Sequence, residues 1–165
     1  MEIKRLVKED AGIYKPLRLE ALKNSPEAFG SSYEEEKDLG LEVTERRFSQ
    51  ENSFTFGAFE ENRLIGTVSL VRETKRKFQH RASIFAMYVQ KDSRRKGAGR
   101  KLMEAAIEKA RSLDGLEQIL LTVVSSNAGA KNLYAGLGFT VYGEDKRALK
   151  LETEYFDETL MVLYV

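Results

Sequence analysis

The segment Arg94–Lys101 (Arg-Arg-Lys-Gly-Ala-Gly-Arg-Lys) constrains this chain more than any other, because it lies between an apolar run that ends at Val89 and a helical pattern that begins near Gly99. Two glycines one residue apart remove side chains where the backbone must approach another group closely. The first turn of a helix leaves N–H groups unpaired, and the helix dipole adds a partial positive charge there. We therefore predict a strand, a turn and a helix start that together bind an anion. The segment 91–101 suits a pyrophosphate, since it contains the cations Lys91, Arg94, Arg95, Lys96, Arg100 and Lys101.

Two familiar phosphate loops do not fit this segment. No Gly-Lys-Ser or Gly-Lys-Thr follows the turn, and the three-glycine fingerprint of dinucleotide-binding proteins is incomplete. Two other interpretations stay open at this point, a basic solvated turn that caps a surface helix and a patch that binds nucleic acid. The net charge of +1, from 27 basic and 26 acidic residues, gives no reason to expect nucleic acid or an anionic membrane as a partner.

The composition narrows the class of protein further. At 165 residues the chain is predicted to form one domain, residues 1–165, with a core of its own. It contains no cysteine and one histidine, His80, so we expect no metal site built from these residues. No apolar run approaches the roughly 18 residues of a membrane helix, and the N-terminus lacks the core of a signal peptide. We expect a soluble, cytoplasmic protein.

Hydrophobic periodicity predicts alternating strands and helices. Strands are expected at residues 3–7, 53–58, 64–71, 82–89, 118–124, 140–143 and 159–164, and helices at 13–22, 41–50, 99–113 and 128–137, with 144–158 as a charged connection. Strands 82–89 and 118–124 should pair in parallel through a right-handed crossover. The predicted fold is of the α/β (α+β) class: a central mixed, mostly antiparallel sheet of about six to seven strands with helices on both faces.

Two motifs now resemble the GNAT superfamily of N-acetyltransferases, and the resemblance spans nearly the whole chain. Arg94-Arg95-Lys96-Gly97-Ala98-Gly99 is similar to the Arg/Gln-x-x-Gly-x-Gly/Ala loop that binds acetyl-CoA in that family. Asn127-x-x-Ala130-x-x-Leu133-Tyr134-x-x-Leu137-Gly138-Phe139 is similar to its second cofactor helix. The end, Tyr155–Met161, is similar to the Asp-Glu-x-x-Met tail of many members. The resemblance implies a GNAT-like acyl-CoA N-acyltransferase fold with acetyl-CoA as the acetyl donor.

The resemblance also implies roles for particular residues. The backbone of Met87, Tyr88 and Val89 would pair with the pantetheine arm, where the next strand would splay away. The other implied cofactor residues are Arg94, Arg95, Lys96, Gly97, Ala98 and Gly99 at the pyrophosphate, Arg100 and Lys101 beside it, Asn127 and Ala130 along the pantetheine, and Tyr134 at the sulfur. Three positions depart from the commonest pattern: Arg95 where many members have Gly, Ala98 where many have Ile or Leu, and Lys91 where Pro is usual. None of them removes a backbone donor.

Acetyl transfer to an amine requires a neutral nucleophile, a polarised carbonyl and a protonated leaving thiolate. Tyr134 is the predicted catalytic residue, because its phenol can donate a proton or a hydrogen bond to the developing thiolate, and a strand amide near Tyr88 would polarise the thioester carbonyl. Because the chain has no cysteine, we predict direct attack in a ternary complex rather than an acetyl-thiol intermediate. Ser83 stands where histone-acetylating members carry a glutamate base, so the proton is expected to leave through water to a carboxylate or to His80.

The acceptor side is less constrained. Phe29, Tyr33 and Phe85 are the predicted lining residues. The run Glu34–Glu36 is interpreted first as a solvated helix face. If this run and Glu152, Glu154, Asp157 and Glu158 faced the cleft instead, the site would favour a small cationic amine or a peptide or protein amine. The predicted function is an acetyl-CoA-dependent N-acetyltransferase. The alternative is a non-catalytic acetyl-CoA-binding sensor or interaction domain, and the resemblance also allows a homodimer.

Overall fold

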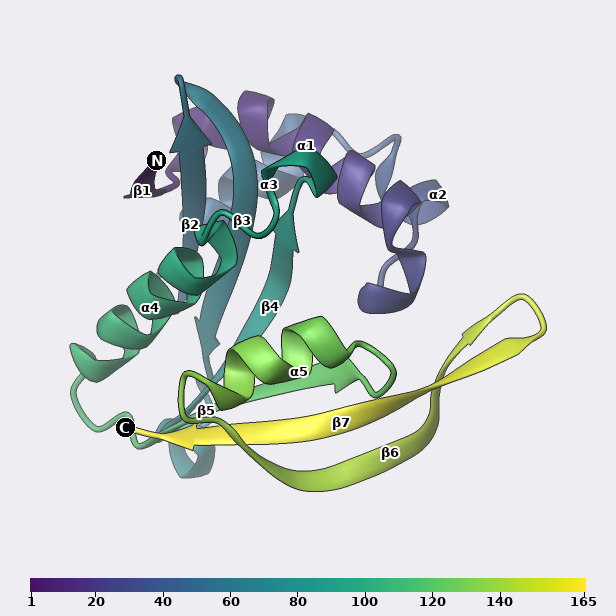
Figure 1. Cartoon of the computed structure of the whole chain (residues 1–165). Coiled ribbons are helices and arrows are strands. Elements are labelled where there is room, and N and C mark those ends of the chain that lie inside the picture. Colours follow the sequence, from purple (N-terminus) through teal and green to yellow (C-terminus); the bar gives the residue numbers. More distant parts are fainter.

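Seven strands form one sheet in the order β1-β2-β3-β4-β5-β7-β6 in the computed structural model, which describes residues 1–165 (Figure 1). The strands are β1 Glu2–Arg5, β2 Ser53–Glu60, β3 Arg63–Arg72, β4 Arg81–Val89, β5 Gln118–Val124, β6 Thr140–Leu151 and β7 Glu154–Tyr164. All neighbouring strands are antiparallel except β4 and β5, which are parallel. The predicted mixed, mostly antiparallel sheet is confirmed.

Helices cover both faces of this sheet, as the sequence predicts. The helices are α1 Ala11–Asn24, α2 Tyr33–Glu36, α3 Leu41–Phe48, α4 Ala98–Arg111 and α5 Ala128–Ala135, with short 3₁₀ turns η1 Lys8–Asp10, η2 Pro26–Ala28, η3 Arg76–Phe78 and η4 Lys91–Ser93. Figure 1 shows α4 and α5 in front of the sheet and α1 to α3 on the other side of β2 and β3. No helix of the structure is long and apolar enough to cross a membrane.

The two faces of the sheet bury two separate apolar clusters. The larger one joins the inner face of α4, including Leu102 and Met103, to Val68 and Leu70 of β3. In the smaller one, the inner face of α1 packs against α3 and the opposite face of β3 and β4, and its members include Leu17, Leu22, Phe48, Leu64 and Tyr88. Burial of apolar surface stabilises by roughly 25 cal/mol per Å². Both clusters therefore hold β4 firmly from its two sides.

The C-terminal hairpin corrects the prediction for residues 144–158. This segment is not a connection, because β6 and β7 run to Leu151 and from Glu154 as one long hairpin. The prediction was wrong because β6 is an edge strand whose side chains are mostly exposed, so its sequence lacks the alternation of a half-buried strand. Contacts across the hairpin stabilise it instead. The Arg147 N–H donates to Asp157 Oδ1 at 2.8 Å, and the Arg147 guanidinium lies 3.7 Å from the centre of the Tyr155 ring.

Strands β4 and β5 diverge after a short parallel pairing. Their register includes only Arg81–Ser83 of β4 opposite Gln118–Leu120 of β5. Beyond this point β4 contains a bulge: Ala86 has φ of +52°, and the register with β3 shifts there. A bulge bends a strand and increases its local twist. The predicted splay beside residues 87–89 is therefore confirmed, and it opens the sheet at its centre.

Candidate active site

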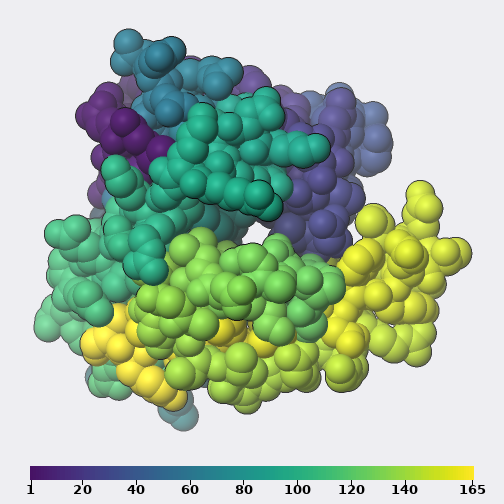
Figure 2. All heavy atoms as spheres, in the orientation of Figure 1, coloured from purple at the N-terminus to yellow at the C-terminus, as the bar shows by residue number.

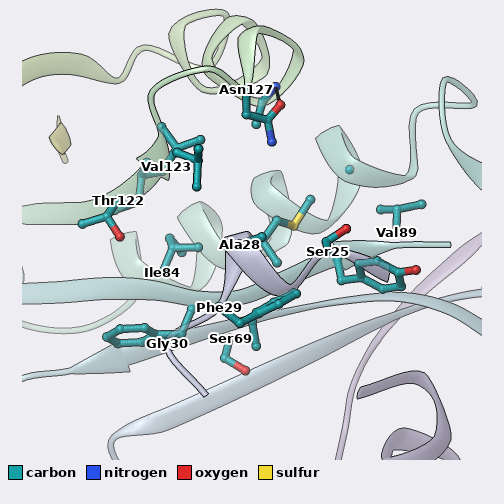
Figure 3. Close-up of a pocket in the computed structure, with 18 of the residues that line it drawn as sticks. Ser25, Ala28, Phe29, Gly30, Ser69, Ile84, Val89, Thr122, Val123 and Asn127 are labelled. Carbon is teal, nitrogen blue, oxygen red and sulfur yellow. Dashed lines mark hydrogen bonds between the residues drawn. The ribbon is translucent and has the colours of Figure 1, made fainter. Parts of the chain in front are cut away.

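The divergence of β4 and β5 opens into a cleft of about 1440 Å³. Figure 2 shows it as a hollow between the green atoms of α5, the teal atoms around η4 and the indigo atoms of α1 and the segment after it. In Figure 3, Thr122, Val123 and Asn127 approach the pocket from β5 and the turn that follows. Ser69, Ile84 and Val89 approach it from β3 and β4.

The turn before α4 has the backbone geometry of an anion site. Arg95 and Gly97 both have left-handed backbones, with φ of +62° and +86°. The helix begins at Ala98, and the first of its backbone bonds runs from Lys101 N to Gly97 O at 3.1 Å. The N–H groups of residues 98–100 therefore precede the intrahelical ladder, at the positive end of the helix dipole. Arg95 thus adopts a left-handed conformation that a glycine takes more readily.

Gly99 allows α4 to approach two other elements closely. A Cβ atom at this position would lie 3.2 Å from Met87 Cε of β4 and 3.3 Å from Leu133 Cδ2 of α5. By contrast, nothing lies within 4 Å of the corresponding position at Gly97. The first glycine is needed for its backbone conformation and the second for its lack of a side chain. Both glycines line the cleft, so the backbone that they expose can contact a ligand.

The cations around this turn have different surroundings. Arg94 Nε donates to Val89 O at 2.9 Å, and the guanidinium lies over the Tyr88 ring, which ties the turn to the end of β4. Arg94, Arg95 and Arg100 line the cleft. Three other predicted cofactor residues are outside its lining: Lys96, which lies 3.9 Å from Glu60, the buried Ala98, and the exposed Lys101. Their role in binding pyrophosphate stays a prediction.

At residues 87–89 of β4, the backbone edge of the strand is available to a ligand. The Tyr88 hydroxyl donates to Glu20 Oε1 of α1 at 3.0 Å, and Asn24 lies 3.5 Å from it. Burial raises the pKa of Tyr88, and the hydrogen bond and charge of Glu20 raise it further, while Asn24 and Arg94 oppose this. Because the pairing with β5 ends at Ser83, the backbone edge of Met87–Val89 has no neighbouring strand on that side. An extended ligand could pair there as an added strand would.

Asn127, Ala130 and Tyr134 line the opposite side of the cleft. The Asn127 side chain caps α5, because its Oδ1 accepts from Ala130 N at 3.1 Å. Tyr134 is 7% exposed, its ring packs edge-on against Phe139, and burial raises the pKa of Tyr134 to about 12. No hydrogen bond contributes to that pKa. The phenol is therefore protonated at neutral pH and free to donate into the cleft.

At the far end of the cleft, two of the three predicted acceptor residues are present. Phe29 and Phe85 line it, and the Phe85 side chain is exposed although it is a large aromatic residue on a central strand. Tyr33 does not line it; its ring lies 4.3 Å from the Lys23 ammonium instead. His80, a predicted proton acceptor, is also outside the lining, in the turn just before β4.

Glu36 corrects the prediction of a solvated acidic face. Glu34 and Glu35 are exposed, but Glu36 is only 8% exposed and lines the cleft. Its carboxylate accepts two hydrogen bonds from Arg18, at 3.1 Å from Nε and 2.9 Å from Nη2. Burial alone would raise the pKa of Glu36, but the hydrogen bond and charge of Arg18 outweigh it, with help from Ser31 and Arg47, and the pKa is lowered. The sequence gives no signal for this pair, whose members are separated by 18 residues.

Further polar residues of the cleft come from the C-terminal hairpin. Glu158 of β7 lies opposite Asp145 of β6, and both line the cleft with Thr122. Burial raises the pKa of Glu158, the charge of Asp145 raises it further, and a hydrogen bond from Thr122 opposes the shift. Of the seven acidic residues considered from the sequence, only Glu36 and Glu158 line the cleft. Asp145, Thr122, Arg18 and Arg47 were missed, because only the fold brings them together.

Metal ligation is not supported by any grouping of side chains. The structure contains no group of three or more His, Cys, Asp or Glu residues placed to hold a metal ion.

Comparison with known proteins gives consistent matches. The sequence model of the acetyltransferase (GNAT) family matches residues 19–139. The streptothricin acetyltransferase of Escherichia coli is 34% identical over 116 residues, which are 70% of this chain and 64% of that protein. The chain thus matches less than two thirds of the length of this relative.

Two solved structures share the whole fold. An acetyltransferase of the GNAT family from Streptococcus pneumoniae superposes with a TM-score of 0.89 at 25% identity, over 99% of each chain. A GNAT superfamily phosphinothricin acetyltransferase from Sinorhizobium meliloti, solved in complex with acetyl-CoA, superposes with a TM-score of 0.85 at 17% identity. This match covers 99% of the present chain and 88% of the other. These matches extend through β6 and β7, which lie beyond the range of the family match.

Proposed function

The chain belongs to the acetyltransferase (GNAT) family, and we propose that residues 1–165 form one enzyme domain that moves the acetyl group of acetyl-CoA to a primary amine. One observation carries this proposal: the cleft between β4 and β5 joins an anion-binding turn, a free strand edge and the unpaired phenol of Tyr134. These three features suit the pyrophosphate, the pantetheine amides and the sulfur of an acyl-CoA thioester. A polar chamber at the other end of the same cleft leaves room for an acceptor.

We infer that the donor lies along the cleft from the turn to Tyr134. The N–H groups of residues 97–100 would bind the pyrophosphate, where Gly97 and Gly99 leave the backbone uncovered. The edge of Met87–Val89 would pair with the amide groups of pantetheine, with Asn127 and Ala130 on its other side. The acetyl-CoA complex of the S. meliloti relative supports this placement, because the two chains share the fold.

The chemistry follows from the groups present. The amine nitrogen attacks the thioester carbon, an N–C bond forms and the C–S bond breaks. Because the pKa of Tyr134 is about 12, above the value of about 8.5 for a thiol, its phenol stabilises the departing thiolate by a hydrogen bond while keeping its own proton. Solvent then protonates the thiolate. The products are the N-acetylated amine and free CoA.

The proton that the amine loses also needs an acceptor. At neutral pH an alkylamine is protonated, and its deprotonation requires a base in the site. We propose Glu158, directly or through a water molecule, since it lines the cleft and its pKa is raised toward the working range. Glu158 would thus take the role of the glutamate base that histone-acetylating members carry at the position of Ser83. The chain has no cysteine to carry the acetyl group, so transfer is direct.

Calorimetric titration with acetyl-CoA, followed in the same preparation by thiol release against a panel of amines, tests this proposal. Binding with turnover on at least one primary amine is the expected result. Binding without turnover on any amine would instead support a non-catalytic sensor. No binding of acetyl-CoA would overturn the assignment of the turn and of the whole cleft.

A further inference from the structure

The acceptor end of the cleft has a hydroxyl-rich floor. Ser53 and Thr55 lie two residues apart on β2, so their side chains share one face of the strand, and Ser69 lies opposite Thr55 on β3. Thr55 Oγ1 and Ser69 Oγ are 2.7 Å apart, and all three residues line the cleft. Figure 3 shows Ser69 below Phe29 and beside Gly30. Phe85, which is 57% exposed, also lines this end, so the floor offers both hydrogen bonds and an aromatic surface.

One wall of this chamber is cationic. It consists of α1 and α3, where Arg18 is already neutralised by Glu36 and lies 4.9 Å from the Phe29 ring. Arg47, in the last turn of α3, is exposed and lines the cleft, and its side chain makes no ion pair or hydrogen bond within the chain. Its positive charge nevertheless helps to lower the pKa of Glu36 and opposes the rise in the pKa of Tyr14. Arg47 is therefore the one cation at this end without a partner.

The other walls are acidic. Asp145 and Glu158 extend from the hairpin, and Glu27 extends from η2. None of these three carboxylates forms an ion pair within the chain, unlike Asp157 of the same hairpin, which is bound by Lys146 and by the Arg147 N–H. Three unpaired carboxylates and the unpaired Arg47 guanidinium thus line the same cleft from different elements. Walls of opposite charge attract a ligand that carries both a positive and a negative group in one orientation, and repel it in the reverse orientation.

From these walls we propose that the acceptor is a small zwitterion, a primary amine that also carries a carboxylate. The inference rests on the proposed acetyl transfer. The ammonium group would lie against Glu158 and Asp145, and the carboxylate would pair with Arg47 above the hydroxyls of the floor. A diamine would place its second cation against Arg47, and an uncharged alkylamine would leave Arg47 without a partner. An arginine also binds a carboxylate with two parallel hydrogen bonds, which fixes the ligand's orientation.

Three matched series of amines test this proposal. They are ω-amino acids, n-alkylamines and terminal diamines of equal chain length, each assayed by CoA release at saturating acetyl-CoA. We expect the best ω-amino acid to exceed the matched alkylamine in kcat/KM by about tenfold, and the diamine to be the poorest of the three. In Arg47→Gln the ratio of kcat/KM between amino acid and alkylamine should fall about tenfold, mainly through KM. Arg47→Lys should keep most of that ratio.

A control variant and the opposing outcomes complete the test. Arg46→Gln removes a neighbouring exposed arginine that does not line the cleft, so it should leave the ratio unchanged. Diamines that outrank the amino acids, or an Arg47→Gln ratio equal to that of the unmodified protein, would overturn the zwitterion while leaving the transferase intact. Acetyl-CoA binding without turnover on all three series would overturn the transferase itself, and the zwitterion with it.

Discussion

Replacement of Glu36 by Gln should destabilise the protein strongly, because it leaves a buried guanidinium without its counter-charge. In the pair that Glu36 forms with Arg18, the side chains are 9% and 13% exposed, and two hydrogen bonds join them. An exposed ion pair contributes about 0–1 kcal/mol, whereas removal of one partner of a buried pair costs about 3–5 kcal/mol. We expect the lower end, about 3 kcal/mol, because the cleft lets water reach Arg18 after the change.

That loss is large enough to measure in two ways. For a chain of this length, each kcal/mol lowers Tm by roughly 2–4 °C, so Glu36→Gln should lower Tm by about 6–12 °C. Urea denaturation at pH 7, followed by circular dichroism, should give a lower midpoint at an unchanged slope. Glu34→Gln is the matched control, since Glu34 is exposed and pairs with Lys37 at the surface. It should change stability by less than about 1 kcal/mol.

The pH dependence provides an independent check. The pKa of Glu36 is lowered in the folded protein, so its contribution to stability is present above the pKa of the unfolded chain. It is lost as pH falls through the lower, folded pKa. The stability difference between the parent protein and Glu36→Gln should therefore be greatest at neutral pH and shrink in acid. A difference below about 1 kcal/mol at pH 7, or one that grows in acid, would refute the assignment of a buried, charged pair.

Three further changes test the cleft. Tyr134→Phe should lower kcat about 100-fold with little change in the affinity for acetyl-CoA, because it removes only the hydrogen bond to sulfur; unchanged turnover in the CoA-release assay would remove its catalytic role. Gly97→Val forces a β-branched residue to φ near +86°, at a cost of about 1–3 kcal/mol, and should weaken acetyl-CoA binding in calorimetry more than Gly97→Asn, since Asn tolerates this region. Burial raises the pKa of Glu158, so kcat/KM should fall as pH drops through a pKa above the usual glutamate value, and this acid limb should be absent in Glu158→Gln. A limb that persists in that variant would assign the base elsewhere.

Most residues predicted for the donor side line the cleft, whereas most of the charged residues at its other end were not predicted, for a physical reason. The turn at residues 94–99 is encoded locally, because a left-handed glycine and a helix start depend on neighbours in the chain. The same holds for Asn127, which caps the helix that follows it. The outer part of the β6–β7 hairpin, within residues 144–158, was missed, since its exposed residues carry no hydrophobic period.

The acceptor side is harder to predict, because the burial and pKa of its charged residues depend on partners from other elements of the fold. The sequence around Glu36 predicts a solvated side chain, whereas in the fold Glu36 is buried and pairs with Arg18 of α1. Glu158 becomes a candidate base only when β6 places Asp145 beside it. The opening that exposes these groups depends on the bulge at Ala86, whose carbonyl accepts from the Thr67 hydroxyl at 3.2 Å, and on the parallel pairing that stops at Ser83. Under the proposed function, binding of acetyl-CoA would therefore persist through local motifs, while the preferred acceptor would change by single substitutions on α1, α3 or the hairpin.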